Sequence, residues 1–254
     1  MSVLLVEKHS PQVTLLTLNR PDRRNALTIE LMDELTAAIE AASADVSQRA
    51  LVLRGAGKGF CTGLDLQAAA ENDPHATAQA AAKVLLAIAE TPLVTIAAVH
   101  GAAVAGGAGV MSACDFVVAA EKTKFGYPEV RRGLVAGIVM TFLRRQLRER
   151  DARELLLASE LIDANRAHAI GLVNRVVAAD QLMPTVDQIV SSILQGAPGA
   201  LKNSKRLLAE LWPTSVREDI ERALKHHLEA RESPEASEGI AAFNEKRVPR
   251  WTLP

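Results

Sequence analysis

Cysteine is scarce in this chain of 254 residues. Its two cysteines, Cys61 and Cys114, lie in apolar or small-residue surroundings, and their separation fits neither a disulfide framework nor a metal-binding motif. We therefore expect a reduced, cytoplasmic protein. His226 and His227 are adjacent in a helical pattern without a second pair of ligands, so we expect no bound metal.

Long apolar runs and an excess of one charge are also missing. No apolar stretch reaches the ~20 residues that a membrane-spanning helix needs. The N-terminal sequence MSVLLVEKHSPQVTLLTLNRP interrupts its apolar runs with charges too early for a signal peptide. The 29 Lys and Arg residues balance 30 Asp and Glu residues to a formal net charge of −1. These absences argue against a membrane or a nucleic acid as partner.

What the chain does contain is an alternation of strand and helix patterns, with 48% hydrophobic residues. The strand-like runs are VLLVEK, VTLLTL, ALVLRG, LVTIAAV and FVVAA, and the helical runs between them are TIELMDELTAAIEAAS and HATAQAAAKVLLAIAE. This alternation predicts an α/β fold with a mostly parallel, helix-covered sheet. From about Gly137 onward amphipathic helical patterns predominate, namely PTVDQIVSSILQ, PGALKNSKRLLAEL and SVREDIERALKHHLEA, and GLVNRVV remains as a strand candidate.

Glycine is concentrated in VHGAAVAGGAGVMSACD, from Val99 to Asp115. Its spacing does not match the dinucleotide-binding motif, GAGKGF lacks the Ser or Thr of a phosphate loop, and no G-x-S-x-G sequence indicates a hydrolase. Two glycine-containing turns, in ALVLRGAGKGFCTGLDL and VTIAAVHGAAVAGGAG, each follow a buried-looking strand. Such turns can aim two backbone N–H groups at one oxygen, although the glycines could also serve only tight strand-to-helix packing.

Five blocks in order, over nearly the whole chain, resemble a known family. They are NRPDRRNAL, GKGFCTGLDL, AAVHGAAVAGGAG followed by ACDFVVAAEKTKFGYPEVRRGL, LIDANRAHAIGLVNRVV, and EGIAAFNEKRVPRW. The family is that of the enoyl-CoA hydratases and isomerases, also called crotonases. The resemblance implies a crotonase-like spiral of ββα units over residues 1–195 and a C-terminal helical trimerisation region over residues 196–254. It also implies an acyl-CoA thioester substrate, no cofactor besides the coenzyme A of that substrate, and homotrimers that often pair into homohexamers.

The resemblance assigns roles to individual residues. The N–H groups of Leu64 and Gly106 correspond to those that hold the thioester carbonyl oxygen. The positions that the resemblance places along the substrate are Arg24, Ala26, Phe60, Cys61, Thr62, Gly63, Asp65, Leu66, Gly107, Gly109, Pro128, Phe243 and Lys246. Among them, Phe243 and Lys246 are expected at the nucleotide end, and Asp65 is also expected to stabilise its own turn.

Glu129, in FGYPEVRRG, corresponds to the family glutamate that transfers a proton to or from the carbon next to the thioester. Such a group needs a pKa raised toward neutrality by burial, and its apolar neighbours Phe125 and Val130 are compatible with burial. Taken without the family, Glu129 fits better as a solvated carboxylate paired with Arg131 or Arg132.

Gly109 departs from the family pattern, because hydratases of the family often carry a second, water-positioning glutamate there. If this position faces the pocket, its missing side chain leaves room for substrate bulk or an ordered water. The segment LVAGIVMT after Gly133 predicts an apolar pocket wall.

A single carboxylate fits two reactions. In a hydratase it handles both water and proton, and in an isomerase it removes a proton and returns it elsewhere. We expect hydration of an enoyl-CoA, with double-bond isomerisation as the alternative. A non-catalytic acyl-CoA or RNA binder is a further alternative, which Glu129, both glycine turns and the balanced charge argue against.

Overall fold

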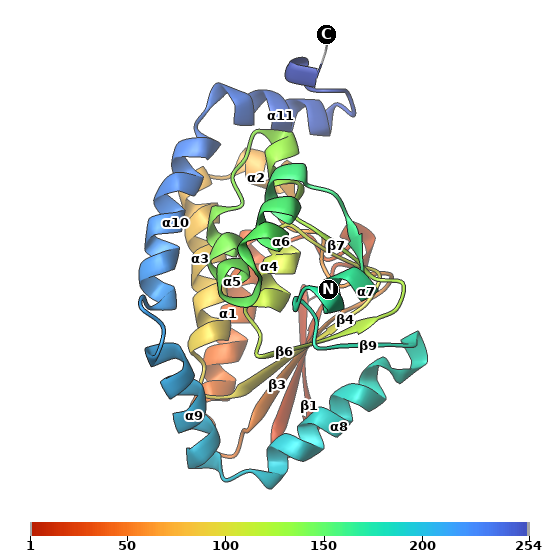
Figure 1. Ribbon diagram of the computed structural model, residues 1–254, viewed down its shortest axis with the longest axis vertical. Helices are drawn as coiled ribbons and strands as arrows, with labels where there is room; N and C mark the ends of the chain where they lie inside the picture. The colour runs from red at the N-terminus through yellow and green to blue at the C-terminus, as the bar shows by residue number, and fades with distance from the viewer. Residues whose placement is uncertain (1, 253–254) are drawn as a thin grey trace.

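A six-stranded sheet forms the centre of the computed structural model, which describes residues 2–252 (Figure 1). In spatial order its strands are β1 (Leu4–Ser10), β2 (Val13–Leu18), β3 (Ala50–Gly55), β4 (Val94–Val99), β6 (Phe116–Ala120) and β9 (Arg175–Val177). The pair β1 and β2 is antiparallel, and every other neighbouring pair is parallel. The predicted α/β fold with a mostly parallel sheet is confirmed.

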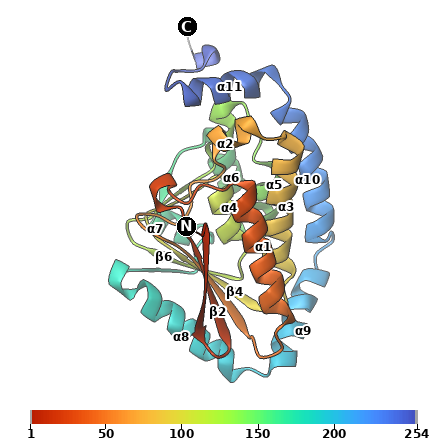
Figure 2. The ribbon, with the colours of Figure 1, turned by 180° about the vertical axis from the view of Figure 1, so that it is seen from behind.

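Both faces of this sheet are covered, which explains its nearly continuous apolar strands. On β3, Ala50 and Val52 pack in the cluster formed with α8 (Leu182–Gln195). Leu51 and Leu53 point the other way, into the larger core cluster with α1 (Ile29–Ala44) and α3 (Pro74–Glu90). Figures 1 and 2 show α8 on one side of the sheet and α1 with α3 on the other.

The predicted long helices form for local reasons as well as for burial. Thr28 caps α1, because its side chain accepts a hydrogen bond from the Leu31 N–H at 3.3 Å. Leu31, Leu35 and Ile39, spaced by four residues, are then buried on one face of that helix. In α3, Asp73 caps the N-terminus in the same way.

A second, smaller sheet was not predicted from the sequence. It consists of β5 (Ala102–Val104), β7 (Lys124–Gly126) and β8 (Ile162–Asp163). Strands of two or three residues are too short to show an alternating pattern, so their sequences carry no strand periodicity. Cys61 pairs with Ala103 in an isolated parallel bridge beside this sheet.

The remaining helices surround the small sheet and extend beyond it. They are α2 (Leu66–Glu71), α4 (Gly106–Ser112), α5 (Gly137–Gln146), α6 (Glu149–Arg153) with a following π-helical turn (Glu154–Ala158), α7 (Ala164–Ala169), α9 (Pro198–Glu210), α10 (Val216–Arg231) and α11 (Pro234–Asn244). Short 3₁₀ helices span Pro21–Arg23, Pro128–Arg132, Ala179–Gln181 and Arg250–Thr252. In Figures 1 and 2, α10 runs alongside α3, and α11 lies at its far end.

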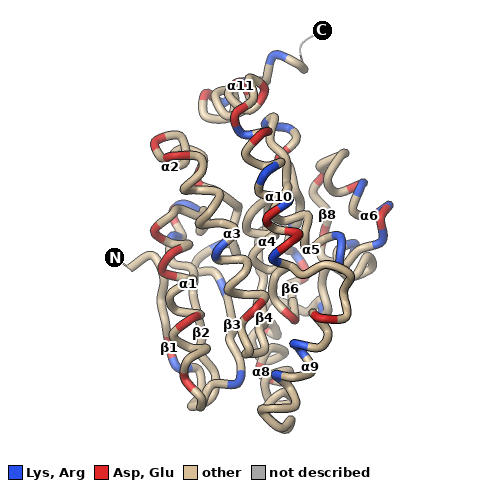
Figure 3. Tube along the Cα trace, turned by 90° about the vertical axis from the view of Figure 1, so that its left-hand side faces the viewer, with Lys and Arg blue, Asp and Glu red and all other residues tan. Residues whose placement is uncertain are grey.

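Basic and acidic residues are interspersed along α10, as the colours of the backbone trace show (Figure 3). Within residues 2–252, no helix is both long enough and apolar enough to cross a bilayer. Asp115 has a structural role, because it accepts hydrogen bonds from the Thr95 N–H at 2.8 Å and from Lys205 Nζ at 2.7 Å. His100 donates from Nε2 to the Gly57 carbonyl at 2.9 Å.

The packing of α11 against the segment Pro128–Arg132 yields a stability prediction. A Cβ on Gly239 would lie 2.3 Å from the carbonyl carbon and oxygen of Arg132, whereas a Cβ on Gly199 of α9 meets nothing within 4 Å. We expect Gly239→Ala to lower the free energy of unfolding by about 1–3 kcal/mol, because the backbones must separate. Gly199→Ala, the control, should raise it by up to about 1 kcal/mol. Urea unfolding followed by circular dichroism measures both, and equal effects would contradict the close packing.

Candidate active site

Two chain segments meet at one edge of the main sheet. Since β3 and β4 are parallel neighbours, the segments that follow them leave the sheet at the same edge. There the Val104 N–H donates to the Cys61 carbonyl at 3.0 Å, and Cys61 pairs with Ala103. This pairing brings the later residues of each segment, Leu64 and Gly106, together.

The amides of Leu64 and Gly106 are close neighbours. A Cβ on Gly106 would lie 3.8 Å from the Leu64 nitrogen, and a Cβ on Gly63 would lie 3.2 Å from the Gly106 nitrogen. Within residues 2–252, neither N–H donates a hydrogen bond to the chain. Both residues line the same cavity. Two free N–H donors on one cavity are the arrangement that can bind a developing oxyanion.

The turn before Gly106 is strained. Ala105 has φ 52° and ψ −129°, a conformation that favours glycine, and α4 begins directly after it at Gly106. No side chain caps this helix. Its first N–H groups therefore remain available, and the positive end of the helix dipole lies at the cavity.

Glu129 lies on the 3₁₀ helix Pro128–Arg132, and Tyr127 anchors this segment. The Tyr127 ring is fully buried, and its hydroxyl is 3.2 Å from Ser112 Oγ of α4. Ser159 Oγ donates to the Tyr127 carbonyl at 3.2 Å. These contacts hold the start of the segment in place from both ends of the tyrosine.

The Glu129 carboxylate has one oxygen that is buried without a partner. Within residues 2–252, its Oε2 has no hydrogen bond and no ion pair, since Arg131 donates to the Ala158 carbonyl and Arg132 stacks on Phe243. Burial raises the pKa of Glu129 to about 7, against the smaller opposing effects of a backbone N–H and the Arg132 charge. The alternative of a solvated carboxylate paired with an arginine is therefore wrong.

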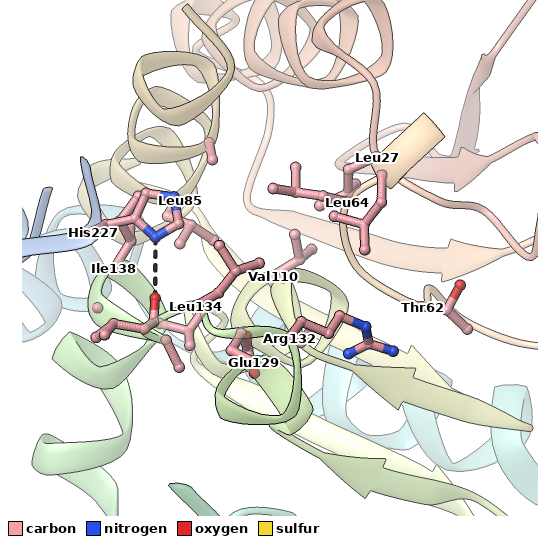
Figure 4. Close-up of a pocket in the computed structure, with 18 of the residues that line it drawn as sticks. Leu27, Thr62, Leu64, Leu85, Val110, Glu129, Arg132, Leu134, Ile138 and His227 are labelled. Carbon is pink, nitrogen blue, oxygen red and sulfur yellow. Dashed lines mark hydrogen bonds between the residues drawn. The ribbon is translucent and has the colours of Figure 1, made fainter. Parts of the chain in front are cut away.

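A cavity of about 110 Å³ joins the amides to Glu129 (Figure 4). The apolar wall predicted from LVAGIVMT is confirmed, because Leu134, Val135 and Ile138 line it. Glu129 is the one carboxylate along it among the described residues. The full lining is Leu27, Thr62, Leu64, Leu66, Ala81, Val84, Leu85, Ala105, Gly106, Val110, Glu129, Arg132, Leu134, Val135, Ala136, Gly137, Ile138, Val139, His227 and Phe243.

The predicted site residues divide into two groups. Those on the cavity are Thr62, Leu64, Leu66, Gly106, Glu129 and Phe243. Those that do not line it are Arg24, Ala26, Phe60, Cys61, Gly63, Asp65, Gly107, Gly109, Pro128 and Lys246. The roles expected of this second group along coenzyme A stay predictions.

Several members of the second group have structural partners. Phe60 and Cys61 are fully buried, and their N–H groups donate to the Ala102 carbonyl. Asp65 caps α2 and forms an ion pair of 3.0 Å with Arg20. Burial raises the pKa of Asp65, but hydrogen bonds from the Ala68 N–H and from Arg20 outweigh this and hold it below its usual range.

The expectation of open space at Gly109 was wrong. A Cβ on Gly109 would lie 2.3 Å from Cγ1 of Val139 and 3.8 Å from Cδ1 of Leu85. The position does point toward the side chains of the cavity wall, but Val139 from α5 already occupies the space in front of it. The sequence could not show this, because the two residues belong to separate helices.

Sequence reasoning also missed two polar residues of the cavity. Arg132 stacks on Phe243 of α11, with its guanidinium carbon 4.4 Å from the ring centroid, and its Nε is buried without a partner in the described chain. His227, on α10, uses Nδ1 to donate to the Val135 carbonyl at 3.1 Å. Only the folding of distant helices onto the site brings these residues there.

Comparison with solved structures agrees with this fold. A putative enoyl-CoA hydratase from Mycobacterium avium paratuberculosis K-10 superposes with a TM-score of 0.87 at 36% identity, covering 98% of this chain and 100% of that one. An enoyl-CoA hydratase/isomerase from Xanthobacter autotrophicus Py2 gives a TM-score of 0.88 at 33% identity, with coverage of 100% and 99%. The fold is thus the crotonase fold, and the chain is an enzyme of that class.

Sequence relatives define the family. The sequence model of the family described as enoyl-CoA hydratase/isomerase matches residues 8–253 of this chain. A putative enoyl-CoA hydratase of Thermus thermophilus is 36% identical over 97% of this chain and 100% of the relative. The 2,3-dehydroadipyl-CoA hydratase of Escherichia coli is 36% identical over 98% of each. The chain belongs to the enoyl-CoA hydratase/isomerase family.

The contact between Gly109 and Val139 predicts energetic coupling. Gly109→Ala alone should lower the free energy of unfolding by about 1–3 kcal/mol, because the new methyl group overlaps Val139. With Val139→Ala the methyl group has room and the helix propensity of alanine is gained. The double variant should therefore be more stable than the sum of the single effects by about 0.5–3 kcal/mol. Urea unfolding of the four proteins measures the cycle, and strict additivity would contradict the contact.

Proposed function

We propose that this enzyme is an enoyl-CoA hydratase that adds water to a 2-enoyl-CoA thioester with Glu129 as its single acid and base. The observation that carries the proposal is one carboxylate with a buried, unpartnered oxygen on the same cavity as two free backbone N–H groups. The hydratase names of relatives at 36% identity support the choice of reaction.

The substrate carbonyl oxygen accepts hydrogen bonds from the N–H groups of Leu64 and Gly106. Polarisation of the carbonyl makes the β-carbon of the conjugated double bond electrophilic. The amides are fixed before substrate binds, so they stabilise the charge that develops on the oxygen without reorganising.

Glu129 then moves the protons. In its ionised form it takes a proton from water while the water oxygen bonds to the β-carbon, and the electron pair of the double bond shifts to the thioester oxygen as an enolate. The enolate carbonyl re-forms as the α-carbon takes the proton from Glu129. One water has been added, and the carboxylate is ionised again. A pKa of about 7 suits both halves of this cycle.

The remaining predicted residues serve binding. Thr62 and Phe243 lie on the cavity, and Arg24, Ala26 and Lys246 lie outside it. We assign these residues to binding of the coenzyme A part of the substrate, which hydration does not change. The apolar wall of Leu134, Val135 and Ile138 takes the acyl chain.

Isomerisation is the second candidate, because Glu129 is the single carboxylate along the cavity among the described residues. One carboxylate can remove a proton from the chain and return it at another carbon. Mass spectrometry of the products from a panel of enoyl-CoA thioesters separates the two reactions. A gain of one water supports hydration, and a shifted double bond without a change of mass contradicts it.

Glu129→Gln should keep the fold and lower kcat for hydration by about 10²–10⁴-fold, because the amide cannot take a proton from water. Steady-state kinetics measure the loss, and circular dichroism verifies the fold. Glu121→Gln, which changes an exposed carboxylate away from the cavity, is the matched control and should retain the wild-type kcat. A Glu129→Gln enzyme that turns over at the wild-type rate would rule out this role.

The pH profile gives the same assignment a second readout. Only ionised Glu129 can begin hydration, so kcat/KM should be constant above pH about 7 and fall about tenfold per pH unit below it. The residual kcat/KM of Glu129→Gln should not show this fall at low pH. A rate that instead falls above pH 7 would mean that the protonated acid begins the reaction.

We also propose that the chain assembles as a homotrimer, which can pair into a hexamer. No residue of α9 is buried. Leu207 and Leu208 on this helix, and Leu211 directly after its end, are 53%, 68% and 74% exposed. Such an apolar face is the kind that contacts another subunit. Sedimentation equilibrium should find three or six copies of the 27.2 kDa chain, and a monomer would contradict the proposal.

A further inference from the structure

The cavity has a far end that the hydration chemistry does not use. In Figure 4, Thr62 and His227 lie at opposite ends of the site, with Leu64, Val110 and Glu129 between them. An acyl chain whose carbonyl meets the amides of Leu64 and Gly106 therefore points its distal end toward His227. This direction rests on the proposed function.

The walls at this end come from three helices. Leu85 belongs to α3, Ile138 to α5 and His227 to α10. Leu85, Ile138 and the nearby Leu134 offer only hydrocarbon. His227 is the one polar side chain at this end of the described cavity, since Thr62, Glu129 and Arg132 lie away from it (Figure 4).

A hydrogen bond fixes which nitrogen of His227 carries the proton. Nδ1 lies 3.1 Å from the Val135 carbonyl, and a carbonyl oxygen can only accept, so Nδ1 is the donor. In the neutral ring Nε2 is then an acceptor. Burial, together with the charge of Arg231, holds the pKa of His227 below its ordinary value despite the hydrogen bond to Val135. The ring is therefore neutral at pH 7.

The Nε2 lone pair is unused. Within residues 2–252, His227 Nε2 has no hydrogen-bond partner. The surrounding protein atoms do not enclose this nitrogen completely. The residue lines the cavity. An acceptor in a mostly apolar cavity loses free energy when the ligand in front of it offers no donor.

We propose that His227 Nε2 accepts a hydrogen bond from the distal end of the acyl chain, so that the preferred substrates are short-chain 2-enoyl-CoA thioesters with a terminal hydroxyl group. A hydroxyl supplies the missing proton. A methyl end leaves Nε2 unpaired, and a terminal carboxylate sets its lone pairs against that of the nitrogen. The small cavity of about 110 Å³ restricts the chain to short lengths.

The test compares kcat/KM for three thioesters of matched chain length, with an unsubstituted, a hydroxylated or a carboxylated terminal carbon, over a series of short lengths. At the best length, the wild type should favour the hydroxylated substrate over the unsubstituted one by about fivefold or more. The carboxylated substrate should be the poorest. A wild-type ratio of one or below at every length would overturn the proposal.

Variants assign the preference to one nitrogen. His227→Phe keeps a ring but no acceptor, so the ratio for hydroxylated over unsubstituted substrate should fall to one or below. His227→Gln can donate to the Val135 carbonyl and still accept, and should restore part of the ratio. His226→Phe changes the exposed neighbour on the same helix and should keep the wild-type ratio. A merely structural histidine would change the rates for both substrates together, and an unchanged ratio in His227→Phe would refute the proposal.

Binding measurements separate this inference from the reaction itself. If no thioester gains water, the proposed function fails, but calorimetry with saturated acyl-CoA and its terminally hydroxylated counterpart still tests His227. Tighter binding of the hydroxylated ligand to the wild type, lost in His227→Phe, supports the recognition of hydroxyl independently of catalysis. Equal binding of both ligands contradicts it.

Discussion

The site depends on the parallel pairing of Cys61 with Ala103 outside the main sheet. The strands β3 and β4 end at the same edge, but that alone leaves their following segments free to diverge. The hydrogen bond from the Val104 N–H to the Cys61 carbonyl prevents this, and Gly107 permits it, because a Cβ there would lie 2.3 Å from the Cys61 oxygen. The positions of the Leu64 and Gly106 amides follow from this junction.

Burial of Glu129 destabilises the fold locally, and contacts of the neighbouring residues hold the carboxylate in place nevertheless. A buried carboxylate oxygen without a partner is destabilising, and here the neighbouring Arg132 turns its guanidinium to Phe243 instead of forming an ion pair. Tyr127 and Ser159 hold the segment that carries the acid. A glutamate paired with an arginine would destabilise the fold less, but its pKa would be low and it would have no free oxygen to take a proton.

The sequence predicted the main sheet, α1, α3 and the helices from α8 to α10, because these elements have recognisable apolar runs or long periodic patterns. It failed for β5, β7 and β8, whose two or three residues show no period. Within the site, motifs identified Glu129 and the glycine turns, since close backbone approach requires particular residues at particular places. Packing between separate helices decides that Val139 fills the space at Gly109 and that His227 lies on the cavity. No local sequence pattern encodes this packing.

The order of elements along the chain differs from their order around the cavity. Strands and helices of the first half supply the amides, whereas His227 and Phe243 come from α10 and α11, after almost everything else. During synthesis the sheet and its covering helices can therefore assemble around an open trough, which becomes an enclosed cavity when the last helices dock. A chain that ended before α10 would therefore lack this wall of the cavity, although it would contain the whole main sheet and the helices α1, α3 and α8 that cover it.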